Sequence, residues 1–143
     1  MAKKKSSARQ VKVAILGAGG RAQSAHYPAL AEIPAAKLVA VCDLDLKRAQ
    51  AAGDKFGIPG RYTNYVEMIE KEKPDAVYAI MPPHHLYDVA AGIIERGCHL
   101  FIEKPPAVTS EQVRQLDLLA RKHKVLTGVT FQRRFSPLIR RGK

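Results

Sequence analysis

The residues best suited to chemistry form a glycine-rich stretch, G-A-G-G-R-A, that begins at Gly17. It follows an apolar, strand-like run and leads into a helix-like stretch, the context in which G-x-G-x-x-A binds phosphate. Gly17 allows a tight turn, Gly19 leaves room for phosphate to approach the backbone, and Ala22 keeps the helix close to the strand. Gly20 and Arg21 complete a loop whose N–H groups favour an anion. Because methyltransferases and simple glycine turns share the pattern, the loop alone does not identify the ligand.

A carboxylate follows the next strand-like run. Asp43 lies 21 residues after Ala22, the spacing at which an acid accepts hydrogen bonds from the adenosine ribose of a bound dinucleotide. A carboxylate there would also repel a 2′-phosphate, so the sequence predicts NAD as cofactor. NADP stays open because Lys47 and Arg48 follow closely. The alternative is that Asp43 or Asp45 only caps the next helix.

From residue 11 onward, short β-branched apolar runs alternate with longer helix-like stretches. This alternation is typical of parallel strands joined by crossover helices, so we expect one α/β domain with a doubly wound, mostly parallel six-stranded sheet, the Rossmann fold. The predicted strands are Val11–Leu16, Lys37–Cys42, Ala76–Ile80, His99–Ile102 and Val125–Thr130, with a weak one at Arg61–Tyr62. The predicted helices are Arg21–Glu32, Asp45–Phe56, Tyr65–Glu72, Leu86–Arg96 and Ser110–His123. Ligands of such sheets bind outside the carboxyl ends of the strands.

The formal charge of the 143-residue chain is +11, which would suit a nucleic-acid-binding protein. Nine of the 24 Lys and Arg residues, however, lie before residue 10 or after residue 132. The other 15 lie between these ends together with all 13 acidic residues, so the body of the chain is nearly neutral. We therefore expect a basic disordered leader (1–10), a dinucleotide-binding domain (11–131) and a basic C-terminal segment (132–143). Nucleic-acid binding would need a folded basic stripe with aromatic platforms, and only Phe131 and Phe135 lie near the terminal charges, so we do not favour it.

The two cysteines, Cys42 and Cys98, lie in separate apolar runs without C-x-x-C or metal-ligand spacing. We expect buried free thiols and no metal site. No apolar run approaches the length of a membrane span, and the first ten residues lack the apolar core of a secretory signal. These features favour a cytoplasmic protein that does not use a membrane.

Two groups of polar residues follow strands in the second half of the chain. Met81 and Pro82 open a turn, M-P-P-H-H, that ends at His85, after the strand at residues 76–80. Glu103 and Lys104 follow the strand at residues 99–102. Because both groups come at the carboxyl ends of strands, we expect them beside the nicotinamide half of the cofactor.

Here the sequence resembles the N-terminal domain of the glucose–fructose oxidoreductase, inositol dehydrogenase and MocA (Gfo/Idh/MocA) family. The resemblance runs from Val11 to about Leu138 and rests on ordered motifs: G-A-G-G-R-A, V-C-D at the second strand, the P-P turn, A-G-I-I-E-R-G-C-H-L-F-I-E-K-P-P, and F-Q-R-R-F. The E-K-P block is the most specific of these.

The resemblance implies roles for individual residues. Lys104 would hydrogen-bond the substrate oxygen near the reacting carbon and is the one candidate catalytic residue. Glu103 would lie near the nicotinamide ribose, and Arg134 at the exit toward a second domain. The family often has a His at the position of Leu86, and here the imidazoles come one and two residues earlier, so the role of His85 and its neighbour stays open.

Family members place a longer second α/β domain after the R-R-F segment, and it supplies the substrate pocket and further catalytic groups. We therefore predict the NAD(P)-binding domain of an oxidoreductase that transfers hydride to or from a sugar- or polyol-like substrate. By itself the chain would bind the dinucleotide, take a substrate only with a second domain supplied, and be catalytically incomplete. The alternative is a stand-alone nucleotide- or partner-binding module without activity, pairing into a homo-oligomer through the edge of the strand at residues 125–130.

Overall fold

A computed structural model describes residues 9–142 of the chain. The expected leader therefore lies mostly outside the described residues, as does Lys143. Of the leader's described residues, Arg9 forms an ion pair with Asp75 (2.6 Å) and the Gln10 side chain donates to the carbonyl of Pro34 (2.8 Å). The chain divides into two compact units, one ending at Ile80 and the other beginning at Met81.

The first unit contains four parallel strands, β1 (Val11–Leu16), β2 (Ala36–Cys42), β3 (Gly60–Tyr62) and β4 (Ala76–Ala79). Their registers align the carboxyl ends, because Leu16 of β1 pairs with both Cys42 of β2 and Ala79 of β4, and Cys42 pairs with Tyr62 of β3. The residues that follow these strands therefore emerge at one edge of the sheet. This alignment brings the loop after β1 close to the acid after β2.

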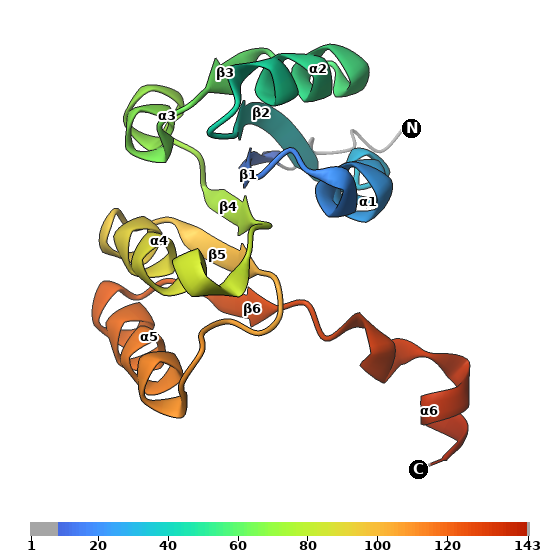
Figure 1. Cartoon of the computed structure of the whole chain (residues 1–143), viewed down its shortest axis with the longest axis vertical. Coiled ribbons are helices and arrows are strands. Elements are labelled where there is room, and N and C mark those ends of the chain that lie inside the picture. Colours follow the sequence, from blue (N-terminus) through green and yellow to red (C-terminus); the bar gives the residue numbers. More distant parts are fainter. Residues whose placement is uncertain (1–8, 143) are drawn as a thin grey trace, which may run out of the picture. The chain divides into compact units, whose positions relative to one another are not determined.

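The helical elements of this unit are η1 (Ala22–His26), α1 (Tyr27–Ala31), α2 (Leu46–Phe56) and α3 (Tyr65–Glu72) (Figure 1). Each of the two longer helices starts where its sequence offers a cap: Asp45 accepts from the Lys47 N–H, and Asn64 accepts from the Val66 N–H, at 2.9 Å each. The core between α1, α2 and the sheet contains Ile15, Val41, Ala18, Ala22, Tyr27, Leu30, Ala49, Ala52 and Ile58, all buried. Ala18 and Ala22 of the loop after β1, and Tyr27 beyond it, are thus part of the hydrophobic core.

The second unit contains α4 (Pro83–Glu95), β5 (His99–Ile102), α5 (Ser110–His123), β6 (Thr127–Val129), η2 (Gln132–Phe135) and α6 (Pro137–Arg141). Strands β5 and β6 are parallel, and α4 buries Leu86, Ala90, Ile93 and Ile94. Thr109 caps α5 by accepting from the Gln112 N–H (3.2 Å), as its spacing predicts.

The six strands follow the order β3-β2-β1-β4-β5-β6, which confirms the predicted six-stranded, doubly wound α/β fold. Within residues 9–142, no helix is long and apolar enough to cross a lipid bilayer.

Several elements differ from those expected. The helix expected from residue 86 begins at Pro83, because proline at the first helical position has a suitable φ and lacks only an N–H that would be unpaired there. The expected first helix opens with a π-helical turn, η1, before α1. Strand β6 has three residues where six were expected, and the basic C-terminal segment forms η2 and α6.

Candidate functional site

The loop after β1 starts with a glycine at a position that strongly disfavours any side chain. Gly17 has φ +104°, in the left-handed region that disfavours a side chain. A Cβ added to it would collide with the carbonyl oxygen of Ile80, at the end of β4. Its N–H donates to the carbonyl of Cys42 (2.8 Å), so the turn is fixed to both neighbouring strands.

The next two glycines have a different environment. A Cβ added to Gly19 or Gly20 would meet no other atom within 4 Å, and neither residue has a positive φ. The packing of the described chain therefore gives no reason for glycine at these positions. Open space above a bare backbone is what a pyrophosphate group requires, and a side chain here would fill it. The loop thus fits a dinucleotide.

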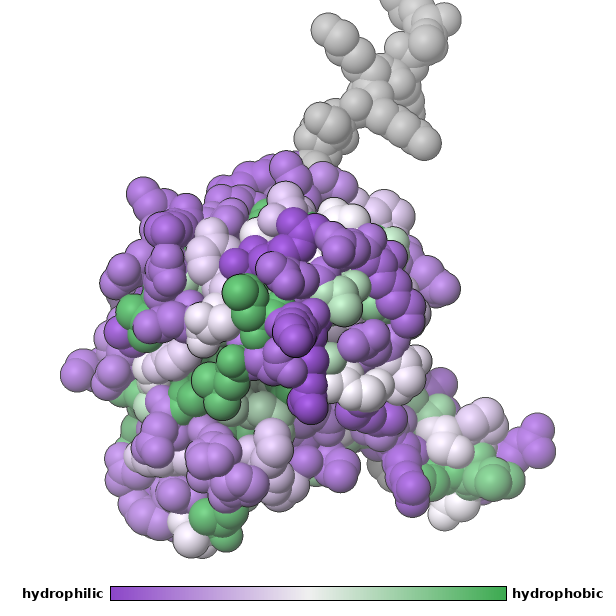
Figure 2. All heavy atoms as spheres, turned by 45° about the horizontal axis from the view of Figure 1, so that its top comes forward, coloured by the Kyte–Doolittle hydropathy of each residue, from purple (hydrophilic) through white to green (hydrophobic). Residues whose placement is uncertain are grey.

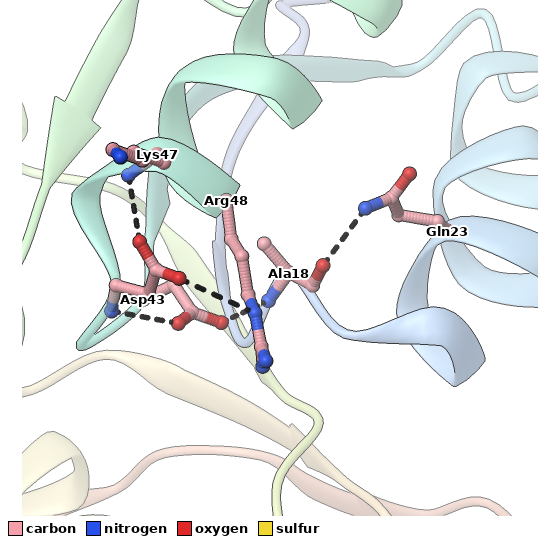
Figure 3. Close-up of polar contacts among 6 residues, drawn as sticks. Ala18, Gln23, Asp43, Lys47 and Arg48 are labelled. Atoms are coloured by element: carbon pink, nitrogen blue, oxygen red, sulfur yellow. Dashed lines mark hydrogen bonds and ion pairs between the residues drawn. The ribbon is translucent and has the colours of Figure 1, made fainter.

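Asp43 is directed at this loop (Figure 3). Its Oδ2 accepts from the N–H of Ala18 (2.8 Å), and its Oδ1 accepts from the N–H of Asp45 (2.9 Å). Asp45, not Asp43, is the N-cap of α2. The two acids offered as alternatives therefore have separate positions: one caps the helix, and the other lies at the loop. Each carboxylate oxygen of Asp43 has a second lone pair, with which it can accept from a ribose hydroxyl.

Two further side chains hold the loop, and neither was predicted from the sequence. The Tyr27 hydroxyl donates to the carbonyl of Gly17 (3.1 Å), and Gln23 donates through Nε2 to the carbonyl of Ala18 (2.9 Å; Figure 3). An amide one residue after the motif and a tyrosine four residues later were the available signals. Neither signal is specific, because surface helices commonly carry Gln and cores commonly contain Tyr.

Burial near Asp43 affects two titratable groups. Burial, reinforced by the negative charge of Asp43, raises the pKa of the Tyr27 hydroxyl well above its usual value. The same two causes raise the pKa of the Cys42 thiol to about 12. Both groups therefore keep their protons at neutral pH, and the Tyr27 hydroxyl remains a donor to Gly17.

The basic residues near Asp43 are largely exposed. The Arg48 Nε lies 3.5 Å from Oδ2 of Asp45, with the Arg48 side chain 63% exposed. Lys47 contributes its backbone N–H to the helix cap (Figure 3). An exposed ion pair of this kind is weak, so the arginine can reorient at little cost.

The first unit thus brings together the predicted loop residues, Asp43 and Arg48. The other predicted residues belong to the second unit. Met81 and Pro82 precede α4, and His85 lies exposed in its first turn with its ring 4.2 Å from that of His84. Among the described residues, no group of three or more His, Cys, Asp or Glu side chains could hold a metal ion.

After β5, the two residues of the E-K-P block differ in exposure. Glu103 is 8% exposed, and its Oε2 accepts from the N–H of Lys104 (3.1 Å). The Lys104 side chain is exposed. Arg134, in η2, is exposed as well. A buried acid thus directly precedes an exposed amine at the end of this strand.

A hollow of about 450 Å³ runs along β3 and α3, apart from the loop after β1. Its polar side chains already pair with one another or with near neighbours: Lys71 with Glu67 and Tyr62 with Glu72, at 2.6 Å each. It gives no sign of a ligand site.

The chain matches known proteins along most of its length. The family described as "Oxidoreductase family, NAD-binding Rossmann fold" (GFO_IDH_MocA) matches residues 11–131. D-glucoside 3-dehydrogenase of Escherichia coli (strain K12) is 36% identical over 126 residues, which are 88% of this chain and 36% of that protein. The scyllo-inositol 2-dehydrogenase (NAD(+)) of Bacillus subtilis (strain 168) is 30% identical over 128 residues, 90% of this chain and 37% of that protein.

Among solved structures, the myo-inositol 2-dehydrogenase of Lactobacillus plantarum superposes with a TM-score of 0.85 at 27% identity, covering 94% of this chain and 40% of that one. The chain therefore spans between a third and a half of the length of these relatives.

Proposed function

The chain belongs to the Gfo/Idh/MocA family of NAD-binding oxidoreductases, and from this premise we propose that it is the cofactor-binding part of a dehydrogenase for sugar- or polyol-like substrates. One observation carries the proposal: a bare loop with open space at Gly19 and Gly20 lies against the carboxylate of Asp43. A dinucleotide needs this combination, because it carries a pyrophosphate next to a ribose diol.

In this proposal the residues from Gly17 to Ala22, including Gly20 and Arg21, hold the pyrophosphate. Asp43 accepts from the adenosine ribose hydroxyls. Its negative charge disfavours a 2′-phosphate, so NAD is the preferred cofactor, while the exposed Arg48 leaves NADP accessible. When bound, the nicotinamide supplies the hydride acceptor or donor.

For the second unit we propose the roles that the family likeness implies. Met81, Pro82 and His85 contact the nicotinamide half of the cofactor, and Glu103 lies near its ribose. The exposed amine of Lys104 hydrogen-bonds the substrate oxygen and is the catalytic candidate. Arg134 lies where the chain leads toward substrate-binding residues. The exposure of Lys104 and Arg134, beside the burial of Glu103, supports this division of roles.

The substrate class comes from the relatives, which act on glucosides and inositols by their names. Because these relatives are more than twice as long, we propose that substrate binding and turnover need residues beyond those in this chain. The chain alone would then bind dinucleotide without turning over substrate. Cys42 and Cys98 are both buried and form no disulfide, which supports a cytoplasmic location.

The test is a fluorescence titration of the 143-residue chain with NADH, compared with Gly19→Val. A valine at this position meets no protein atom within 4 Å of its Cβ, so the fold should be unaffected while the phosphate approach is filled. We expect at least a tenfold rise in Kd, roughly the loss of one or two good hydrogen bonds.

The matched control is Gly142→Val, a glycine with negative φ and only ordinary contacts beyond 3.5 Å, far along the chain from the loop. Its NADH affinity should equal that of the parent. Equal affinity of Gly19→Val and the parent would contradict the assigned phosphate position, and failure of the parent to bind NADH or NADPH would contradict the proposed function itself.

A further inference from the structure

Tyr27 combines complete burial with a polar contact to the loop. Its residue exposure is 0%, and its ring stacks on Phe56 of α2, with ring centroids 4.9 Å apart and planes 18° apart. A tyrosine hydroxyl that is removed from water needs a hydrogen-bond partner. Here the partner is the carbonyl of Gly17 at 3.1 Å. The stacked ring therefore fixes the point from which this hydroxyl donates.

The contacts of Tyr27 and Asp43 fall on the same peptide unit. The carbonyl of Gly17 and the N–H of Ala18 belong to one planar group, and they point in opposite directions because the peptide is trans. Tyr27 donates to the carbonyl edge, while Asp43 accepts from the N–H edge at 2.8 Å. Rotation of this plane would break both bonds together. The peptide is thus held from both sides, by a residue of α1 and by the acid after β2.

The next peptide unit, between Ala18 and Gly19, has a side-chain hydrogen bond on its carbonyl side. Gln23 donates to the carbonyl of Ala18 at 2.9 Å. Because the carbonyl and the following N–H of a trans peptide point in opposite directions, Gln23 also determines where the N–H of Gly19 points. This N–H lies at the residue whose added Cβ would meet only open space.

We infer that Tyr27 and Gln23 are positioning residues for the pyrophosphate: they fix the first two peptide planes of the loop and so present its backbone to the ligand in one orientation. The inference rests on the proposed function. Without the Tyr27 hydroxyl, the Gly17–Ala18 peptide can rotate away from the orientation in which its N–H donates to Asp43. Affinity then falls in proportion to the fraction of molecules that keep the competent loop.

The first variant is Tyr27→Phe, which keeps the stacked ring and removes only the hydroxyl. We expect the Kd for NADH to rise about fivefold, the effect of one neutral hydrogen bond. Hydrogen exchange of the Ala18 amide should become faster, while the affinity for adenosine, which lacks the pyrophosphate, should stay at the parent's value.

The matched control is Tyr62→Phe, which removes a hydroxyl in the same unit that donates to Glu72 (2.6 Å) and not to the loop. Its NADH affinity and Ala18 exchange should equal the parent's. If both variants weaken NADH binding equally, or if Tyr27→Phe binds NADH as tightly as the parent does, the inference is overturned while the proposed function stands.

A second variant decides the matter if Tyr27→Phe does not fold. Gln23 is half-buried on the first helical turn, and Gln23→Met keeps its length without the donor. We expect a two- to fivefold rise in the NADH Kd at an unchanged melting temperature. A folded Gln23→Met with parental affinity would overturn the inference. A parent chain that binds neither NADH nor NADPH would instead refute the proposed function.

Discussion

The loop after β1 and the C-terminal segment, residues 131–142, both follow strands, but they differ in what covers their apolar side chains. Around the loop, Ala18, Ala22 and Tyr27 are at most 1% exposed. In the C-terminal segment the large apolar side chains are exposed, from 44% at Ile139 to 81% at Leu138. Figure 1 shows this segment leading away from β6, and Figure 2 shows its hydrophobic (green) surface open to solvent.

The difference shows which of the two regions is held in one conformation by the contacts around it. The loop after β1 is held by the hydrophobic core, by neighbouring strands and by side-chain hydrogen bonds from Tyr27, Gln23 and Asp43. In the C-terminal segment the Arg140 guanidinium lies over the ring of Phe135, 5.5 Å from its centroid. Segments with few buried apolar contacts unfold locally at little cost. Substitutions should therefore have large effects at the loop and small ones in the C-terminal segment.

The largest effect is expected from Gly17→Ala. The positive φ and the collision with the Ile80 carbonyl should together lower the free energy of unfolding by about 3 kcal/mol or more, measured by urea denaturation. Gly57→Ala is the control, since Gly57 has φ +64° but no atom within 4 Å of an added Cβ, and it should cost only about 1 kcal/mol. Similar losses in the two variants would mean that the close approach of β4 does not constrain the loop.

A smaller effect, on ligand choice more than on folding, is expected from Asp43→Ala. Loss of the charged acceptor should weaken NADH binding by about tenfold or more and NADPH binding by less, since repulsion of the 2′-phosphate is also removed. Titrations with both cofactors measure the two affinities. Asp45→Ala removes the cap of α2 and should cost about 1 kcal/mol of stability without changing the NADH to NADPH ratio. The opposite order of losses in Asp43→Ala would assign the choice of cofactor to Lys47 or Arg48.

The smallest effect is expected from Leu138→Ala, whose side chain is 81% exposed. The free energy of unfolding should change by no more than about 0.5 kcal/mol. The same substitution at Leu30, which is 4% exposed in the core of the first unit, should cost about 2–5 kcal/mol. If Leu138→Ala costs more than about 1 kcal/mol, and the cost grows with protein concentration, then another copy of the chain covers this residue and the contrast between the two regions fails.

Much of the fold could be predicted because its signals are local. The alternation of apolar runs and helix-like stretches located all six strands, and single residues such as Asp45, Asn64 and Thr109 start helices through bonds to the N–H two or three residues later. The start of α4 was missed because a pair of prolines suits a turn as well as a first helical residue. Strand β6 is shorter than predicted, although residues on both sides of it still bond to β5: the Leu100 N–H donates to the carbonyl of Leu126 (2.9 Å), and the Thr130 N–H donates to the carbonyl of Ile102 (3.0 Å).

The sequence by itself determined the loop, the acid 21 residues after it and the family, because each of these depends on residue types at fixed spacing. Only the tertiary structure decided which acid faces the loop, which carbonyl excludes a side chain at Gly17, and which hydroxyl donates to it. The physical reason is that these contacts join residues on different strands and helices. The distances between these residues depend on the sheet register and on the packing of α1 against α2. The spacing of residues along the chain does not reveal either of them.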